Sequence, residues 1–271
     1  MPRVNVARFA AYTRAMSHVA RLFVDQPLKT SASVALDQGQ SKYLLRVMRL
    51  QEGEMLRAFN GRDGEWRCAL RVSGKTVALE PIAQMRAQTV GLDLTLMFAP
   101  IKKTRTDFIV EKASELGVKT LQPVITEYTQ SARVRTDRLQ NLVIEAAEQT
   151  ERLDVPDVRK DLPLAKALAV WDETKPLYHC DEGSEAQPIA DGLRKNPRQS
   201  AGFLIGPEGG FSPREREMLH ALDFVVPVTL GPRILRAETA AVSVLSLWQA
   251  LVGDWTEAPY VPEITFGRLQ A

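Results

Sequence analysis

The chain has 271 residues, of which 45% are hydrophobic, enough to bury the core of one large domain or two smaller ones. Its 35 basic and 33 acidic residues nearly cancel, so the net charge of +2 favours neither nucleic acid nor anionic lipid as a partner. The charge is unevenly distributed, because residues 1–80 carry 13 Lys and Arg against 7 Asp and Glu. This asymmetry is typical of a nucleic-acid-docking module joined to a catalytic body, and also of an ordinary solvated surface.

The sequence indicates neither a metal site nor a membrane segment. Cys68 and Cys180 form no CxxC pair, and His18, His179 and His220 form no HExxH motif. Two distant cysteines suit a reducing cytosol. The most apolar long stretch, 237–252, contains polar residues and is shorter than the roughly 20 residues needed to cross a bilayer. We therefore expect a soluble protein with no metal and no membrane partner.

The first 20 residues contain three arginines and no acid, a composition found in organelle transit peptides. The segment lacks the serine content and the length of such peptides, which favours an unstructured extension or an upstream start codon. We expect a cytoplasmic location, with an organelle as the alternative. Removal of this segment from the mature protein would support the organelle.

The pattern of turns and alternating residues from about 20 to 90 predicts a small β-barrel or sandwich. Two glycine-containing turns, Asn60-Gly61 and Ser73-Gly74, separate short runs in which apolar and polar residues alternate. Alternation with period two between such turns is typical of β-hairpins.

Strands and helices alternate from residue 92 onwards, which predicts an α/β domain with a largely parallel sheet. The expected strands are 92–98, 121–125, 176–180, 203–206 and 224–230. The expected helices are 104–116, one capped by Thr136 that ends before Pro156, one capped by Ser212, and 237–252. Ser212 is one of the clearest helix starts, because Pro213 and Glu215 follow it.

Two loops depart from the ordinary pattern at strand ends. The loop after Leu204 places three glycines and a proline before the helix at Ser212, and the loop after Leu230 combines Gly231-Pro232 with two arginines and Glu238. Glycine lets a ligand approach peptide groups closely, and the carboxyl ends of parallel strands share one edge of a sheet. We therefore expect both loops to line one ligand pocket. Taken singly, each is also typical of a plain turn, and Glu238 of a residue that favours the helix dipole.

Several common catalytic motifs are missing. The sequence has no GxxxxGK[ST] loop of P-loop hydrolases and no GxGxxG motif after an early strand. It also lacks the GxSxG motif of serine hydrolases.

At the two loops the sequence resembles the SPOUT methyltransferases, and within them the ribosomal RNA small subunit methyltransferase E family. The resemblance rests on Ile205-Gly206-Pro207-Glu208-Gly209-Gly210-Phe211-Ser212 and on Leu230-Gly231-Pro232-Arg233-Ile234-Leu235-Arg236-Ala237-Glu238-Thr239-Ala240. Weaker matches at 21–24, 47–53, 112–118 and 148–156 extend it over residues 21 to 252. The chain departs from the family near Lys42-Tyr43, where the family often has His, and near Glu151, where it often has Gly.

This resemblance implies a PUA-like RNA-binding β-barrel followed by a SPOUT α/β domain whose carboxyl half is tied in a trefoil knot. We accordingly expect an extension at 1–20, the barrel at 21–88, the methyltransferase domain at 92–253 and a tail at 254–271. The resemblance also implies a homodimer. The implied reaction is transfer of the methyl group of S-adenosyl-L-methionine to N3 of a uridine in 16S rRNA, free or in the small ribosomal subunit.

Site residues follow from the same resemblance. Those expected to bind the cofactor are Leu204, Gly206, Pro207, Gly209, Gly210, Leu230, Gly231, Ile234, Leu235 and Thr239. Those expected to contact RNA are Arg46, Arg49, Arg67 and Arg71. Arg236 is the candidate to stabilise the uracil anion, because a guanidinium donates hydrogen bonds to O2 or O4 as N3 loses its proton. Glu208 and Glu238 are candidates for accepting that proton or orienting the base.

Two alternatives remain open. One is another SPOUT RNA methyltransferase that acts on tRNA or on a ribose 2′-hydroxyl. The other is a non-catalytic ribosome-assembly protein that binds RNA. The barrel and the sequences of both loops favour a methyltransferase of the uridine-N3 type over other SPOUT enzymes. The presence of Arg236 and Glu238 favours a catalytic protein over a non-catalytic one.

Overall fold

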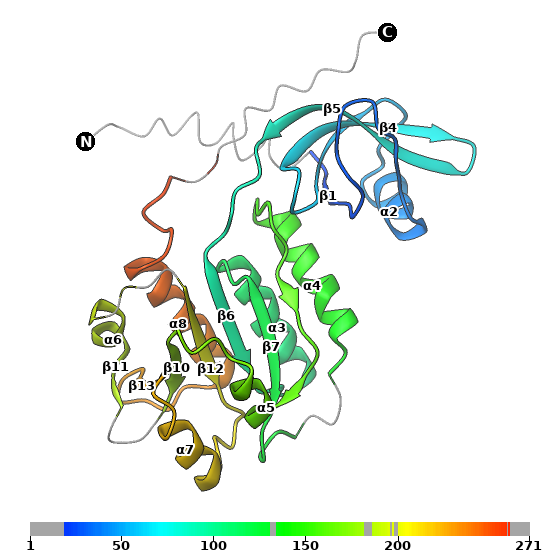
Figure 1. The fold of residues 1–271 in the computed structure, drawn as a ribbon. Coiled ribbons are helices and arrows are strands. Elements are labelled where there is room, and N and C mark those ends of the chain that lie inside the picture. Colours follow the sequence, from blue (N-terminus) through cyan, green and yellow to red (C-terminus); the bar gives the residue numbers. More distant parts are fainter. Residues whose placement is uncertain are drawn as a thin grey trace. The chain divides into compact units, whose positions relative to one another are not determined.

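The computed structural model describes residues 19–130, 134–181, 186–195, 197, 200–258 and 260 (Figure 1). The chain divides into two compact units. The first contains residues up to 90, 151–154 and the C-terminal end from 259, and the second contains 91–150 and 155–258. Nearly all of the expected extension at 1–20, and most of the expected tail at 254–271, lie outside the described residues.

The first unit is built on a five-stranded sheet with the order β1-β3-β4-β5-β2. Its elements are β1 (Arg21–Phe23), β2 (Val34–Ala35), α2 (Gln38–Lys42), the π-helix η1 (Tyr43–Val47), β3 (Met55–Phe59), β4 (Glu65–Ser73) and β5 (Thr76–Arg86). β1 pairs in parallel with β3, and the other neighbours are antiparallel. Leu44 of η1 packs with Leu56, Cys68 and Leu79 of the strands to form the unit's own core.

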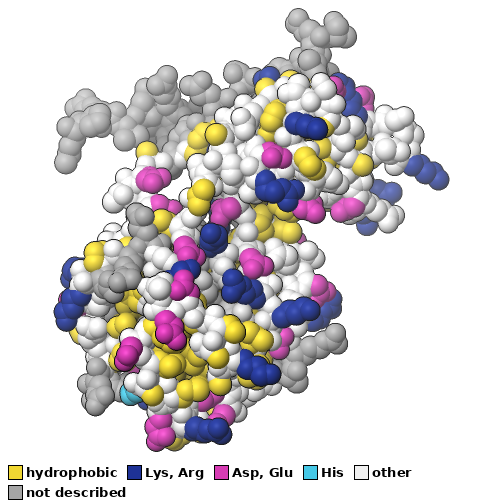
Figure 2. Space-filling view, viewed as in Figure 1, with side chains coloured by type: hydrophobic (Ala, Val, Ile, Leu, Met, Phe, Trp, Pro, Cys, Tyr) yellow, Lys and Arg dark blue, Asp and Glu magenta, His cyan; other side chains and the backbone are white. Residues whose placement is uncertain are grey.

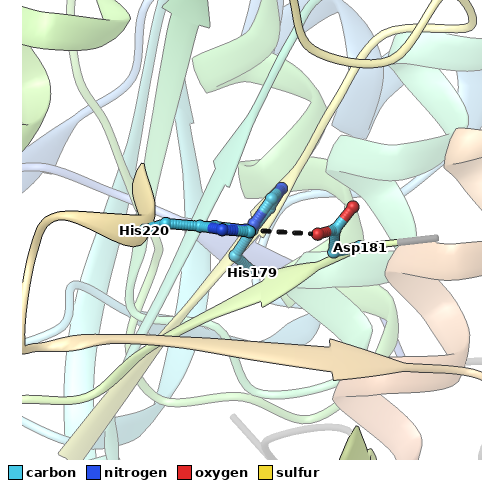
Figure 3. A group of neighbouring side chains, drawn as sticks. All are labelled: His179, Asp181 and His220. Atoms are coloured by element: carbon cyan, nitrogen blue, oxygen red, sulfur yellow. Dashed lines mark hydrogen bonds and ion pairs between the residues drawn. The ribbon is translucent and has the colours of Figure 1, made fainter. Parts of the chain in front are cut away.

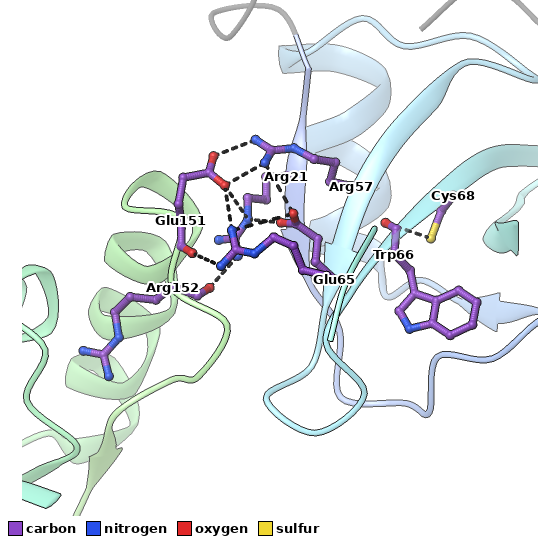
Figure 4. Close-up of polar contacts among 8 residues, drawn as sticks. Arg21, Arg57, Glu65, Trp66, Cys68, Glu151 and Arg152 are labelled. Atoms are coloured by element: carbon purple, nitrogen blue, oxygen red, sulfur yellow. Dashed lines mark hydrogen bonds and ion pairs between the residues drawn. The ribbon is translucent and has the colours of Figure 1, made fainter. Parts of the chain in front are cut away.

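A cluster of ion pairs is buried in this unit (Figure 4). Arg21 Nε lies 2.6 Å from Glu65 Oε1, and Arg57 donates to both carboxylate oxygens of Glu151 at 2.7 Å. Burial alone would raise the pKa of Glu151, but the hydrogen bonds and positive charge of Arg57, together with the charges of Arg21 and Arg86, lower it below its ordinary value. Residues 151–154 therefore belong to the first unit, whereas the sequence places them in the second domain.

Glu151 occupies a backbone conformation that normally favours glycine. Its φ is +63°, in the left-handed region. Here the ion pairs of the side chain offset the backbone strain, which explains why a glutamate is tolerated.

The second unit is a parallel eight-stranded sheet with the order β11-β13-β10-β12-β6-β7-β8, in which β9 also pairs with β7. Its strands are β6 (Asp93–Phe98), β7 (Thr120–Ile125), β8 (Asp157–Val158), β9 (Leu162–Pro163), β10 (Leu177–Cys180), β11 (Gln187–Pro188), β12 (Ser200–Ile205) and β13 (Val225–Thr229). Its helices are α3 (Lys103–Glu115), α4 (Thr136–Gln149), α5 (Leu164–Ala169), α6 (Ile189–Lys195), α7 (Pro213–His220) and α8 (Ala237–Leu251).

Helices cover both faces of this sheet (Figure 1). One core contains apolar residues of α3, α4, α6 and α8, among them Ile109, Val143, Leu193 and Trp248. The second core contains residues of α5 and α7 with the opposite sides of the strands, including Leu204. Strands buried on both faces explain the continuous apolar runs in the sequence.

The expected α/β class, the largely parallel sheet and the start of α7 are confirmed. Ser212 accepts a hydrogen bond from Glu215 N, and the Glu215 carboxylate accepts one from Ser212 N, which forms a capping box. The predicted cap at Thr136 is wrong: Arg135 precedes the helix without a side-chain cap, and Thr136 is its first residue. The described residues contain no helix long and apolar enough to span a membrane.

Candidate active site

Three adjacent parallel strands of the second unit end at one cavity of about 610 Å³. β10 lies between β12 and β13, and its end contributes Cys180 and Asp181 to the lining. The loops that follow β12 and β13 contribute most of the rest. Both Gly-Pro loops therefore line one pocket, as the sequence predicts, because the carboxyl ends of parallel strands lie at the same sheet edge.

Most of the residues expected to bind the cofactor line this cavity. They are Gly206, Pro207, Gly209, Gly210, Leu230, Gly231, Ile234 and Leu235. Leu204 and Thr239 do not line it. Leu204 is fully buried in the core that β12 shares with α5 and α7. Thr239 is exposed on α8, and its carbonyl accepts a hydrogen bond from the Ser243 hydroxyl at 2.8 Å.

Glycine is needed at specific points of these loops. Gly210 and Gly231 have φ values of +68° and +98°, where a side chain would strain the backbone. A Cβ on Gly206 would lie 2.7 Å from the ring of Phe211. Phe211 is buried and stacks edge-on against His179 at 4.9 Å between ring centroids, so the first loop is anchored to the sheet below it.

Opposite charges lie side by side on the cavity wall. Arg216 of α7 donates to Asp181 Oδ1 at 2.9 Å, and both residues line the cavity. The Asp181 side chain is only 4% exposed. Sequence reasoning missed this pair, although the position of Asp181 directly after a buried strand was an available signal. A ligand that carries both an ammonium and a carboxylate could be held here.

His179 and His220 lie beside Asp181 (Figure 3). Their ligating atoms lie within 4.8 Å of one another, and within the described part of the chain no other group has this spacing. His220 Nε2 lies 3.4 Å from Asp181 Oδ2, while both ring nitrogens of His179 are buried and have no hydrogen-bond partner among the described residues. The Arg216 guanidinium already forms an ion pair with the Asp181 carboxylate, and its positive charge would repel a metal cation. We therefore assign no metal to this cluster. The absence of a metal stays a prediction.

Arg105 of α3 joins the two candidate acids. Its guanidinium forms an ion pair with Glu208, and its Nε lies 3.5 Å from Glu238 Oε1. The other oxygen, Glu238 Oε2, is buried and has no hydrogen-bond partner in the part of the chain that the structure describes. Glu208 lines the cofactor cavity and Glu238 does not; Glu238 lies in the first turn of α8. The sequence gives no signal for Arg105, because nothing in its local pattern distinguishes it from a solvated residue.

Arg236 stands at the mouth of the cavity. It precedes the first residue of α8, lines the cavity and is exposed. Its backbone carbonyl accepts a hydrogen bond from Ala240 N at 2.8 Å, while its side chain caps no backbone group.

The arginines expected to contact RNA lie in the first unit and differ in availability. Arg46 and Arg49 are exposed, Arg67 is half-buried, and Arg71 lies 2.5 Å from Glu80 and 3.3 Å from Glu52. On the face shown in Figure 2, basic and acidic side chains are interspersed. Arg46 and Arg49 are therefore the better placed of the four to meet a phosphate.

Family models match most of the chain. An RNA methyltransferase domain matches residues 89–249, and an RNA methyltransferase PUA domain matches residues 36–82. The ribosomal RNA small subunit methyltransferase E of Rickettsia conorii is 30% identical over 228 residues, which cover 83% of this chain and 93% of the relative. The chain belongs to the ribosomal RNA small subunit methyltransferase E family.

Other members of this family support the assignment. The Synechocystis member is 32% identical and the match covers 86% of this chain and 78% of the relative. A structure of the Neisseria gonorrhoeae member bound to S-adenosyl methionine is 30% identical, with a TM-score of 0.78, over 88% of this chain and all of that one. A putative methyltransferase from Legionella pneumophila with bound SAM is 28% identical, with a TM-score of 0.77, over 86% of this chain and 97% of that one.

Proposed function

We propose that this protein transfers the methyl group of S-adenosyl-L-methionine (SAM) to N3 of a uridine in 16S rRNA. Family membership supports the class of reaction. The observation that carries the proposal is the cavity of about 610 Å³ that two Gly-Pro loops form at the carboxyl ends of three parallel strands.

The residues around this cavity fit SAM. Its volume lies within the roughly 300–1,000 Å³ of small-molecule sites. Leu230 and Leu235, which are partly exposed, offer apolar surface to an adenine, the loops offer backbone groups, and Asp181 with Arg216 offers opposite charges to an amino acid. When bound, SAM supplies an electrophilic methyl group on a sulfonium.

The chain's own residues then act on the acceptor. Arg236 donates a hydrogen bond to O2 or O4 of the uracil and stabilises the negative charge that develops as N3 is deprotonated. Glu208 and Glu238 remain the candidates to accept the proton, and Arg105 is the positioning residue that contacts both. The loops hold the reactants together, an effect worth about 7–11 kcal/mol in favourable intramolecular cases.

The proposed partner is 16S rRNA, free or assembled in the small subunit. Arg46 and Arg49, with Arg67 in support, contact its phosphates, whereas Arg71 is held by Glu52 and Glu80. RNA affinity should therefore fall as salt is added, because each neutralised phosphate releases counterions. A salt-independent affinity would contradict the role of these arginines.

We further propose a homodimer, a trefoil knot in the carboxyl half of the second unit, and a cytoplasmic location. Ile234 supports the dimer: it lies on a cavity-lining loop, yet its side chain is 81% exposed. A second copy of the chain would remove this apolar surface from water. Sedimentation equilibrium should give twice the chain mass, and a monomer at micromolar concentration would contradict the dimer.

One assay separates the candidate functions. The protein is incubated with methyl-labelled SAM and with unmodified 16S rRNA, small subunits or tRNA, and the labelled nucleoside is identified by mass spectrometry. We expect 3-methyluridine from the small-subunit substrates alone. A labelled tRNA or 2′-O-methylribose would indicate another SPOUT methyltransferase, and tight RNA binding without label would indicate an assembly protein.

Replacement of Arg236 tests the proposed mechanism. We expect Arg236→Ala to lower kcat at saturating SAM by about 100-fold, comparable to the loss of one oxyanion donor. SAM affinity, measured by calorimetry, should change much less. Full activity of this variant at saturating SAM would exclude the anion-stabilising role.

A further inference from the structure

A second cavity of about 240 Å³ adjoins the cofactor cavity and shares a wall with it. Its lining comes from residues 100–103 before α3, from Tyr128 and Gln130 after β7, and from Pro207–Gly209, which also lines the first cavity. At roughly 30 Å³ per water molecule, the space holds about eight waters. This is enough space for one pyrimidine ring.

Tyr128 is an exposed aromatic residue held on a fixed turn. Its exposed fraction is 46%. Thr126 N donates to Thr129 Oγ1 at 2.9 Å, and Thr129 N donates to the Thr126 carbonyl at 3.1 Å, so the turn is closed on itself. Glu127 N donates to Glu215 Oε1 at 2.9 Å, which ties the same turn to the capping box of α7. The ring is therefore presented to the cavity without a further ordering cost to its backbone.

The chemistry of the cavity suits a nucleotide. Lys102 and Lys103 are exposed and form no ion pair with any residue that the structure describes. They stand at the start of the 13-residue helix α3, where free N–H groups and the helix dipole also favour an anion. The carboxylate of Glu208 faces the same cavity, but the guanidinium of Arg105 offsets its charge.

We infer that this second cavity is the acceptor-nucleotide subsite, in which the target pyrimidine stacks on Tyr128 and Lys102 and Lys103 hold its phosphate. The inference rests on the proposed function. A uridine that presents N3 must leave its own stack or be unpaired, and the Tyr128 ring replaces the contact it loses. Pro207–Gly209 lines both cavities, so a base in the second cavity would lie next to the cofactor cavity, with Glu208 beside both reactants.

Kinetics of paired variants test the stacking role. Tyr128→Ala should raise KM for the RNA at least about fivefold, the lower end expected for loss of one base–aromatic stack. Tyr128→Phe should stay within about twofold of wild type, because it keeps the ring. Trp255→Ala removes another exposed aromatic, 54% exposed, and serves as the control. An unchanged KM in Tyr128→Ala, or an equal rise in Tyr128→Phe, would overturn the inference.

The lysines are tested by the salt dependence of RNA binding. The double variant Lys102→Ala, Lys103→Ala should reduce the slope of log K against log salt by about 1, because the two lysines hold one phosphate. Lys166→Ala on α5 removes an exposed lysine outside the cavity and should leave the slope unchanged. Calorimetry should show SAM affinity within about twofold of wild type in all these variants. A double variant with the wild-type slope would contradict the role of the lysines.

Cross-linking of the wild-type protein keeps the inference testable even if Tyr128→Ala does not fold. An RNA fragment carrying 5-iodouridine at the methylated position is irradiated on the protein, and the linked peptide is sequenced by mass spectrometry. We expect the link at Tyr128. A link elsewhere, with rRNA methylation intact, would overturn the subsite but leave the proposed function standing. Absence of any rRNA methylation by the wild type would instead defeat the proposed function.

Discussion

Arg105 is the side chain that contacts both of the acids proposed to take part in the reaction. It reaches Glu208 and Glu238 from α3, and without it both carboxylates would lose this counter-charge. We expect Arg105→Ala to lower kcat at least tenfold with little change in SAM affinity, and Arg105→Lys to recover part of the loss. Arg194→Ala, on the exposed face of α6, is the matched control. If kcat of Arg105→Ala equalled that of Arg194→Ala, Arg105 would have no positioning role.

His179 makes stability depend on pH. Burial, opposed by Asp181 and assisted by the charges of His220 and Arg216, lowers the pKa of His179 to about 4 from its ordinary 6.5. Between these values the unfolded chain binds a proton that the folded chain excludes, so the free energy of unfolding rises with pH. The free energy of unfolding has its full value above about pH 6.5. As pH falls towards 4, it decreases by roughly 3 kcal/mol because of His179.

The variant His179→Leu isolates this effect. It removes the titrating group and keeps an apolar side chain against Phe211. Chemical denaturation at pH 4.5 and pH 7 should show a smaller difference in unfolding free energy for the variant than for wild type. Equal differences in the two proteins would mean that His179 does not carry the pH dependence.

The sequence could predict those site residues that the backbone conformation of the two loops requires or that stand in these loops. Gly210 and Gly231 are recognisable because positive φ requires them, and Glu208 and Arg236 because they stand in the same loops. Asp181, Arg105 and Tyr128 reach the site from other strand ends and from α3. Only the spatial order of the strands reveals that these segments converge.

At the scale of elements, the start of α7 joins a loop of the first cavity to the turn that lines the second. The Glu215 carboxylate accepts hydrogen bonds from Ser212 N at 3.0 Å and from Glu127 N at 2.9 Å, so it fixes the loop after β12 and the turn of Tyr128 together. Ser212→Ala should cost about 1 kcal/mol, as for other N-cap residues. Glu215→Ala should cost more, because it leaves two backbone N–H groups of different loops without a partner.

Function should separate these two variants further. Glu215, unlike the Ser212 side chain, accepts a hydrogen bond from the turn that carries Tyr128. Glu215→Ala should therefore raise KM for RNA, whereas Ser212→Ala should change it little. Thermal unfolding and RNA kinetics at a temperature where both variants are folded provide the comparison. Equal effects of the two substitutions on stability and on KM would contradict the coupling through Glu215.

Among the elements, long and strongly periodic segments were predictable and short ones were not. α8 follows its apolar periodicity and α7 its capping box, whereas α2, α5 and α6 span only five to seven residues and give too few turns for a periodic signal. The cap at Thr136 failed for a related reason. A threonine before an apolar stripe is compatible with both the cap and the first helical turn, and packing of Leu139 and Val143 fixes the helix more strongly than its cap.

At the scale of the whole molecule, fewer basic side chains of the first unit can meet RNA than its composition suggests. Arg21, Arg57, Arg71 and Arg86 all pair with carboxylates, so they serve the fold of the first unit and reduce the set that can meet RNA. Charge counted along a sequence cannot distinguish a buried ion pair from a free cation.

Glu151 tests how far the buried ion pairs support the first unit. Glu151→Gly would relieve a backbone strain of about 1 kcal/mol but leave the buried Arg57 without its bidentate partner, at a cost of about 3–5 kcal/mol. We expect a net destabilisation of about 2 kcal/mol or more. Ser31→Gly, at φ +66° and exposed, has the same backbone change without ion pairs and should be neutral or stabilising. A stabilised Glu151→Gly would show that strain outweighs the ion pairs.

The central claim is that the two Gly-Pro loops enclose the SAM site, and calorimetric titration with SAM tests it most directly. Ala240 lines the cavity from α8, and Ala250 is exposed on the same helix. We predict one SAM bound per chain in the wild type and in Ala250→Leu, and at least tenfold weaker binding in Ala240→Leu, whose larger side chain fills the cavity. Absence of binding by the wild type, or undiminished binding by Ala240→Leu, would contradict the claim.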